Sequence, residues 1–99
     1  MVHAYMQDVG IDTDTYGRIT EALGDEPMDG LIVHLVVQKP GGGLRYIDVW
    51  ETEEQCARAF EERVHPAVDA AFDGRRPPEP VVTGLDVVEV RGRAIGQPA

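Results

Sequence analysis

The 99-residue sequence contains no serine and only one cysteine, Cys56. The absence of serine excludes a serine-based catalytic triad. A single cysteine forms neither an internal disulfide nor a cysteine-based metal site, and in the apolar stripe of a predicted helix it is expected to be an inert, small hydrophobic group. The three histidines lack the short spacing of metal ligands, so we expect no metal.

Basic residues and long apolar runs are also scarce. Nine Lys and Arg residues oppose eighteen Asp and Glu residues, and the formal net charge is -9. The negative electrostatic field of such a chain disfavours nucleic acid and anionic membranes as partners. No apolar run approaches the roughly 18 residues of a membrane span, and no signal-peptide pattern opens the chain. We expect a cytoplasmic protein with one domain over residues 1–99 and an ordered core over 3–91.

Hydrophobic periodicity predicts the order strand, helix, strand, strand, helix, strand. The strands are expected over residues 3–9, 31–37, 44–50 and 81–90, the last with a bulge at Gly84. The run 31–37 is apolar on both faces, which predicts the central strand of the sheet. The order is ferredoxin-like, so we predict an α+β fold, βαββαβ, with a four-stranded antiparallel sheet and both helices on one face.

Cap and breaker residues predict where the helices begin and end. Asp12 or Thr13 is expected to cap the first helix. Tyr16 in this helix and Tyr5 in the first strand fall on apolar patterns, so both are expected in the core. The second helix begins with a capping box formed by Thr52 and Gln55. Pro66 lies inside its pattern and removes a backbone hydrogen bond, which predicts a kink or a second short helix near that residue.

The hairpin between the two middle strands places polar groups together. If it is symmetric about Gly41, His34 lies opposite Asp48. The predicted pairs on the same face are His34 with Asp48, Val36 with Tyr46, and Ile32 with Trp50. A carboxylate opposite a histidine orients the ring and fixes its tautomer, as a general base requires. The alternative is that the two side chains only satisfy each other's hydrogen bonds.

The junction Asp48-Val49-Trp50-Glu51-Thr52, followed by His65, resembles the dimeric α/β-barrel superfamily, particularly its antibiotic-biosynthesis-monooxygenase-type members. The resemblance implies a homodimer in which two ferredoxin-like subunits pack sheet to sheet. Oxygenases of this type carry an asparagine four residues before the tryptophan, where this chain has Tyr46. The superfamily also includes haem-degrading enzymes, polyketide cyclases and isomerase-like proteins, so the resemblance implies a fold rather than a reaction.

Two functions are consistent with these features. The first is a small cofactor-independent enzyme that oxygenates, cyclises or isomerises an apolar aromatic or polyketide-like molecule, with His34 and Asp48 as catalytic residues. Trp50, Tyr46 and His65 are then the expected substrate-binding residues. The second is a non-catalytic, ligand-binding or stress-associated dimeric module in which the polar pair is structural. A ring-sized cavity beside His34 favours the enzyme, and a filled interior favours the module.

Overall fold

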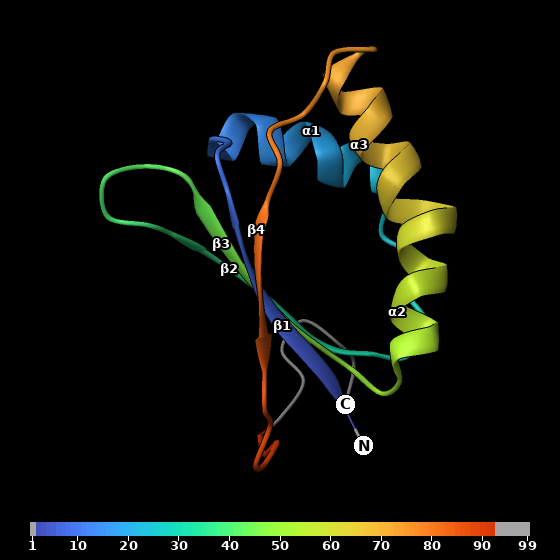
Figure 1. Cartoon of the computed structure of the whole chain (residues 1–99). Helices are drawn as coiled ribbons and strands as arrows, with labels where there is room; N and C mark the ends of the chain where they lie inside the picture. Colours follow the sequence, from blue (N-terminus) through green and yellow to red (C-terminus); the bar gives the residue numbers. More distant parts are fainter. Residues whose placement is uncertain (1, 93–99) are drawn as a thin grey trace.

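A computed structural model of the chain describes residues 2–92 and shows a four-stranded sheet with its helices on one face (Figure 1). The elements are β1 (His3–Val9), α1 (Thr13–Leu23), β2 (Leu31–Gln38), β3 (Leu44–Trp50), α2 (Glu53–Ala59), the π-helix η1 (Phe60–Val64), α3 (His65–Phe72) and β4 (Val81–Leu85). The strand order is β2-β3-β1-β4, and every pairing is antiparallel. The predicted α+β, ferredoxin-like βαββαβ fold is confirmed.

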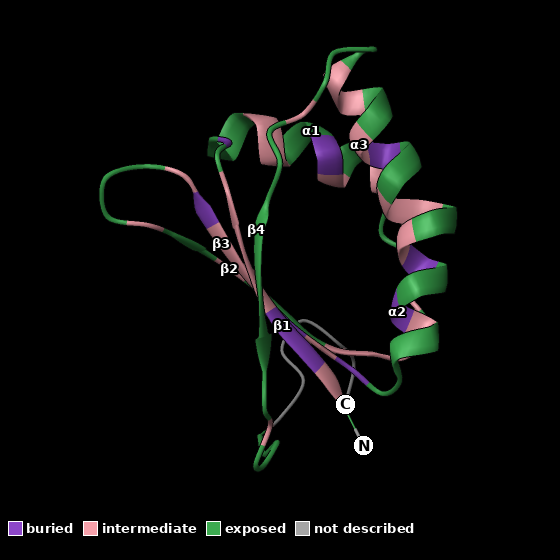
Figure 2. Cartoon of the chain, viewed as in Figure 1, coloured by how far each residue is buried: buried purple, intermediate pink, exposed green. Residues whose placement is uncertain are grey.

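The core lies between the sheet and the helices, where the buried residues of Figure 2 gather. It has two groups of buried side chains, one at each end of the sheet. The first group is Tyr5, Trp50, Cys56 and Ala59. The second group is Ile11, Ile19, Leu44 and Ala67. The space between the two groups is therefore bordered by β1, β3 and the helices.

Side-chain caps begin both helical segments, as predicted. The Asp12 carboxylate accepts a hydrogen bond from the backbone N–H of Thr15 at 2.8 Å. The Thr52 hydroxyl accepts one from the backbone N–H of Gln55 at 3.1 Å. The other half of the capping box differs, because the Gln55 side chain does not reach back to the backbone N–H of Thr52. Its amide oxygen accepts a hydrogen bond from the Thr52 hydroxyl, and its amide N–H donates to the Asp29 carboxylate. This side chain therefore ties the loop before β2 to the start of α2.

The predicted interruption near Pro66 takes the form of a π-helix. The segment η1 widens the helix by one residue, and the backbone N–H of His65 donates to the carbonyl oxygen of Phe60. A new helix, α3, then begins with Pro66 in its first turn, where the missing N–H is tolerated. The π-helix carries Phe60 and Val64, which both face the space above the sheet.

The prediction that residues 31–37 form the central strand is wrong, because β2 is an edge strand that pairs with β3. Its inner side chains face the helices, while Val33, Leu35 and Val37 remain 40%, 48% and 38% exposed on the outer face. A strand with one face against the core and an apolar outer face has the same pattern as a strand buried on both faces. The pattern therefore correctly indicated two apolar faces and misplaced the strand.

Two details of strand pairing also differ from expectation. β4 ends at Leu85 rather than Val90, since Leu85 already lies opposite Ala4 near the beginning of β1. Gly84 pairs in regular register, and the irregularity lies in β2 between Leu31 and Val33. As a result Trp50 is opposite Leu31 instead of Ile32.

Candidate functional site

A cavity of about 210 Å³ lies between the inner face of the sheet and the helices. Its walls are mostly apolar and aromatic, with a few polar groups on the sheet side. The residues lining it are Tyr5, Gln7, Tyr16, Ile19, Thr20, Leu23, Gly24, Met28, Leu31, His34, Tyr46, Asp48, Trp50, Phe60, Val64 and Val68. The interior is therefore not filled by the protein's own side chains.

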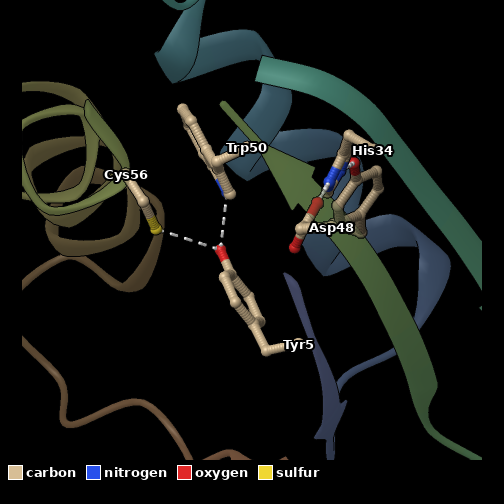
Figure 3. Close-up of polar contacts among 6 residues, drawn as sticks. Tyr5, His34, Asp48, Trp50 and Cys56 are labelled. Atoms are coloured by element: carbon tan, nitrogen blue, oxygen red, sulfur yellow. Dashed lines mark hydrogen bonds and ion pairs between the residues drawn. The ribbon is translucent and has the colours of Figure 1, made fainter. Parts of the chain in front are cut away.

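His34 and Asp48 form a hydrogen-bonded pair at this cavity (Figure 3). They are direct cross-strand partners on β2 and β3, so the predicted register is confirmed at this point. The His34 Nδ1 atom bonds to Asp48 Oδ1. Asp48 is only 4% exposed, whereas the His34 side chain is 34% exposed. A buried carboxylate thus holds a partly accessible imidazole.

Tyr16 of α1 extends this pair into a chain of three groups. Its hydroxyl lies 2.8 Å from His34 Nε2, and the two rings stack with their centroids 6.3 Å apart. In the neutral tautomer that donates Nδ1–H to the carboxylate, Nε2 accepts the hydrogen of the phenol. In that tautomer the order of donation is Tyr16 to His34 to Asp48. The sequence indicated Tyr16 only as a core residue, because its periodicity does not say which strand the helix covers.

Tyr5 and Trp50, which line the same cavity, form a second polar cluster with Cys56 (Figure 3). The indole Nε1–H of Trp50 donates to the Tyr5 hydroxyl oxygen at 3.1 Å, and Cys56 Sγ lies 3.6 Å from the same oxygen. Trp50 is 2% exposed and Tyr5 is 6% exposed. Trp50 is therefore both a core anchor and a cavity wall.

Burial raises the pKa of every phenol around the cavity. All three tyrosines of the chain line it. Desolvation raises the pKa of Tyr46 to about 12 and also raises the pKa values of Tyr5 and Tyr16, with the Asp48 charge adding to each. Burial likewise raises the pKa of the Cys56 thiol. The phenols and the thiol are therefore neutral donors at pH 7.

The structure brings together four of the five predicted site residues. His34, Asp48, Tyr46 and Trp50 all line the cavity. His65 is exposed at the start of α3 and is not among the lining residues. Its ring contacts that of Phe60, with centroids 5.8 Å apart. Among residues 2–92 no group of three His, Cys, Asp or Glu side chains is placed to hold a metal ion, and no helix could span a membrane.

The sequence matches no protein-family model and no curated protein, but several solved structures share the fold. SnoaB, a cofactor-independent oxygenase from Streptomyces nogalater, has a TM-score of 0.57 at 12% identity over 90% of this chain and 94% of its own. A Chloroflexus aurantiacus protein described as an antibiotic biosynthesis monooxygenase has a TM-score of 0.58 at 20% identity, covering 97% and 100%. The heme-degrader MhuD from Mycobacterium tuberculosis has a TM-score of 0.51 at 19% identity, covering 93% and 100%.

These structures are described with different chemistries on one architecture, so the likeness concerns the fold and leaves the reaction to the side chains of each site. The likeness extends over nearly all of both chains. The chain therefore has the same fold as these antibiotic-biosynthesis-monooxygenase-type structures.

Proposed function

We propose that this protein is a small cofactor-independent enzyme that removes a proton from a compact aromatic or polyketide-like molecule. The single observation that carries the proposal is the hydrogen-bonded chain of Tyr16, His34 and Asp48 on the wall of an apolar cavity. A polar pair with only a structural role has no need of an accessible cavity or of a third group on the remaining ring nitrogen. The cavity therefore favours the enzyme over the non-catalytic module.

The chain of three groups supports proton removal without a charged tyrosine. A substrate hydroxyl donates to the Tyr16 oxygen, which passes its own hydrogen to His34 Nε2. The substrate O–H bond breaks, an N–H bond forms on the imidazole, and Tyr16 remains neutral, as its raised pKa requires. The imidazolium then lies against the buried Asp48 carboxylate, which stabilises the new positive charge.

The size and lining of the cavity indicate the substrate. A cavity of about 150 Å³ lined by apolar side chains holds benzene, so about 210 Å³ admits one or two fused rings. Trp50, Tyr46 and Phe60 supply aromatic walls for such rings. The resulting anion is electron-rich and reacts with molecular oxygen, closes a ring or isomerises. The description of SnoaB as a cofactor-independent oxygenase makes oxygenation the first reaction to assay.

The side chains around the cavity do not suit axial ligation of haem. Both ring nitrogens of His34 already have partners, Asp48 and Tyr16. His65 does not line the cavity and approaches it only through its contact with Phe60. The proposal therefore assigns no step to haem and leaves His65 as a predicted substrate-binding residue without a catalytic role.

The test compares turnover of one- and two-ring phenols and hydroquinones by the wild-type protein and by His34→Ala, measured as oxygen uptake and product mass. Loss of a general base lowers the rate about 10²- to 10⁴-fold. We expect that loss in His34→Ala, with an unchanged far-ultraviolet circular dichroism spectrum. His3→Ala is the matched control, because His3 does not line the cavity. Full activity of His34→Ala would remove His34 from the mechanism.

We further propose that a second copy of the chain covers the outer face of the sheet. Five apolar side chains on that face are at least 38% exposed, which is unusual for the face of an isolated sheet. They are Val33, Leu35, Val37, Val81 and Leu85. A two-fold pair buries the same face of both copies. The homodimer thus has the sheet-to-sheet arrangement that the fold resemblance implies.

The dimer is tested by light scattering after size exclusion. The wild-type protein is expected at twice the chain mass, and Leu35→Glu is expected to shift it to the monomer, because the change places a charge on the exposed apolar outer face of β2. Val88→Glu is the control, since Val88 is 98% exposed and lies outside the strands. A monomeric wild-type protein at high concentration would contradict the proposal.

A further inference from the structure

One stretch of the cavity wall is neither helix nor strand. In the described part of the chain, every lining residue except Gly24 and Met28 belongs to β1, α1, β2, β3, η1 or α3. These two residues lie in the loop 24–30, which joins α1 to β2. The other walls move only if hydrogen bonds of a helix or of the sheet break. The loop is therefore the part of the wall that can move by itself.

The loop has a hinge residue at each end and an apolar side chain between them. Gly24 and Gly30 have φ +82° and +85°, in the backbone region that favours glycine. Between them, Met28 is half-buried and packs against the buried group that contains Trp50. The loop thus covers the end of the cavity at which Trp50 lies. A loop with glycine hinges over a cavity has the form of a lid.

A single arginine of η1 holds this loop against the helices. Arg63 Nη1 donates to the carbonyl oxygens of Glu26 and Pro27 at 2.9 and 3.1 Å. Its Nη2 donates to the carbonyl oxygen of Leu23 at 3.2 Å. Leu23 ends α1, whose last turn has no basic residue of its own, so the guanidinium also lies at the negative end of that helix. One side chain therefore joins η1, the end of α1 and the loop.

Three other hydrogen bonds hold the end of the loop that leads into β2. Their pairs are Leu31 with Met28, Glu51 with Gly30, and Gln55 with Asp29. None of the three reaches the middle of the loop, where the carbonyl oxygens of Glu26 and Pro27 both accept from Arg63. Pro27 has no backbone N–H to donate. Among residues 2–92, the middle of the loop is thus held by this one side chain.

We propose that residues 24–30 are a lid over the Trp50 end of the cavity, and that Arg63 is the latch that holds the lid closed. The three carbonyl oxygens are released together when the guanidinium moves away, so the lid opens as a unit. Passage of a molecule through this end of the cavity then requires the opening. The inference goes beyond the proposed function, because the lid depends on the contacts of the loop and not on any reaction.

Backbone hydrogen exchange, measured residue by residue by NMR, follows the opening without a ligand. The N–H groups of Leu31 and Glu51 lose their acceptors in the loop when the lid opens, whereas that of Lys39 is bonded within the hairpin turn at the other end of β2. Loss of one net hydrogen bond changes a population about 2- to 12-fold. Since Arg63→Ala removes three, exchange at Leu31 and Glu51 should accelerate at least about 10-fold, with Lys39 unchanged.

Quenching of fluorescence by acrylamide shows whether the opening reaches the cavity. Trp50 is the single tryptophan of the chain and is 2% exposed, so the closed protein should be quenched weakly. In Arg63→Ala the quenching constant should rise together with the exchange rates. Arg58→Ala is the matched control, because Arg58 is exposed beside the same loop and makes none of the three bonds. Both readings should remain at the wild-type value in this control.

The outcomes distinguish a latch from a residue that only stabilises the whole fold. Equal acceleration at Leu31, Glu51 and Lys39 in Arg63→Ala overturns the latch, as does unchanged exchange or unchanged quenching of Trp50. If Arg63→Ala does not fold, the wild-type protein decides. Exchange at Leu31 and Glu51 that rises with urea as steeply as global unfolding refutes a local opening. Failure to turn over phenols contradicts the proposed function alone, because neither reading uses a substrate.

Discussion

The ionisation of the three tyrosines measures how apolar the cavity is. Desolvation raises the pKa of Tyr46 to about 12, and the pKa values of Tyr5 and Tyr16 are also raised. In the unfolded chain all three phenols ionise near pH 10. When the pH is raised above 9, the folded protein should therefore develop phenolate absorbance well after the unfolded chain does.

The same shift predicts how stability depends on pH. The folded state holds the Tyr46 proton more tightly than the unfolded state does. The contribution of Tyr46 to the free energy of unfolding is therefore fully present below about pH 10 and is lost as the pH rises through about 12. A difference of two pKa units corresponds to about 3 kcal/mol for a fully buried group. Tyr46 is only partly buried, so solvent screening reduces the expected loss to about 1 kcal/mol.

The assay follows near-ultraviolet phenolate absorbance against pH in buffer and in concentrated urea, with circular dichroism to confirm the fold at each pH. Urea unfolding near pH 9 and near pH 11 gives the loss of stability. Tyr46→Phe has no ionisable group at that position and should lose about 1 kcal/mol less over the same interval. Native and unfolded titration curves that superimpose while the protein remains folded would refute the apolar cavity.

Four further substitutions have outcomes that urea unfolding can measure. Gly30→Ala should destabilise the protein by about 1–3 kcal/mol, because Gly30 has φ +85° and a Cβ there would lie 2.8 Å from Gln55 Cβ. Gly17→Ala should stabilise the protein by up to about 1 kcal/mol, because a Cβ at this position of α1 meets open space. Equal effects of the two substitutions would contradict this reasoning. Leu44→Ala should cost about 2–5 kcal/mol, since Leu44 is 2% exposed, and a loss below about 1 kcal/mol would show a looser core. Thr52→Ala removes the cap of α2 and should cost about 1 kcal/mol, with a negligible change as the contrary result.

Local sequence signals were sufficient to predict most of the secondary-structure elements and their order. The caps at Asp12 and Thr52, the glycine-rich turn and the interruption by Pro66 each depend on residues within a few positions of one another. The hairpin register follows from the turn, so the contact of His34 with Asp48 was predictable. The bulge near Leu31 was not, because nothing in its neighbouring residues distinguishes it from regular strand.

The order of elements, the ferredoxin-like topology and the pairing across the hairpin are determined by the sequence itself, since periodicity, caps and turns act over short distances along the chain. Only the tertiary structure decided that β2 is an edge strand and that Tyr16 reaches His34. It likewise decided that Cys56 meets Tyr5, 51 positions away. Such contacts depend on how the helices dock on the sheet, which is the sum of many packing interactions that no single segment encodes.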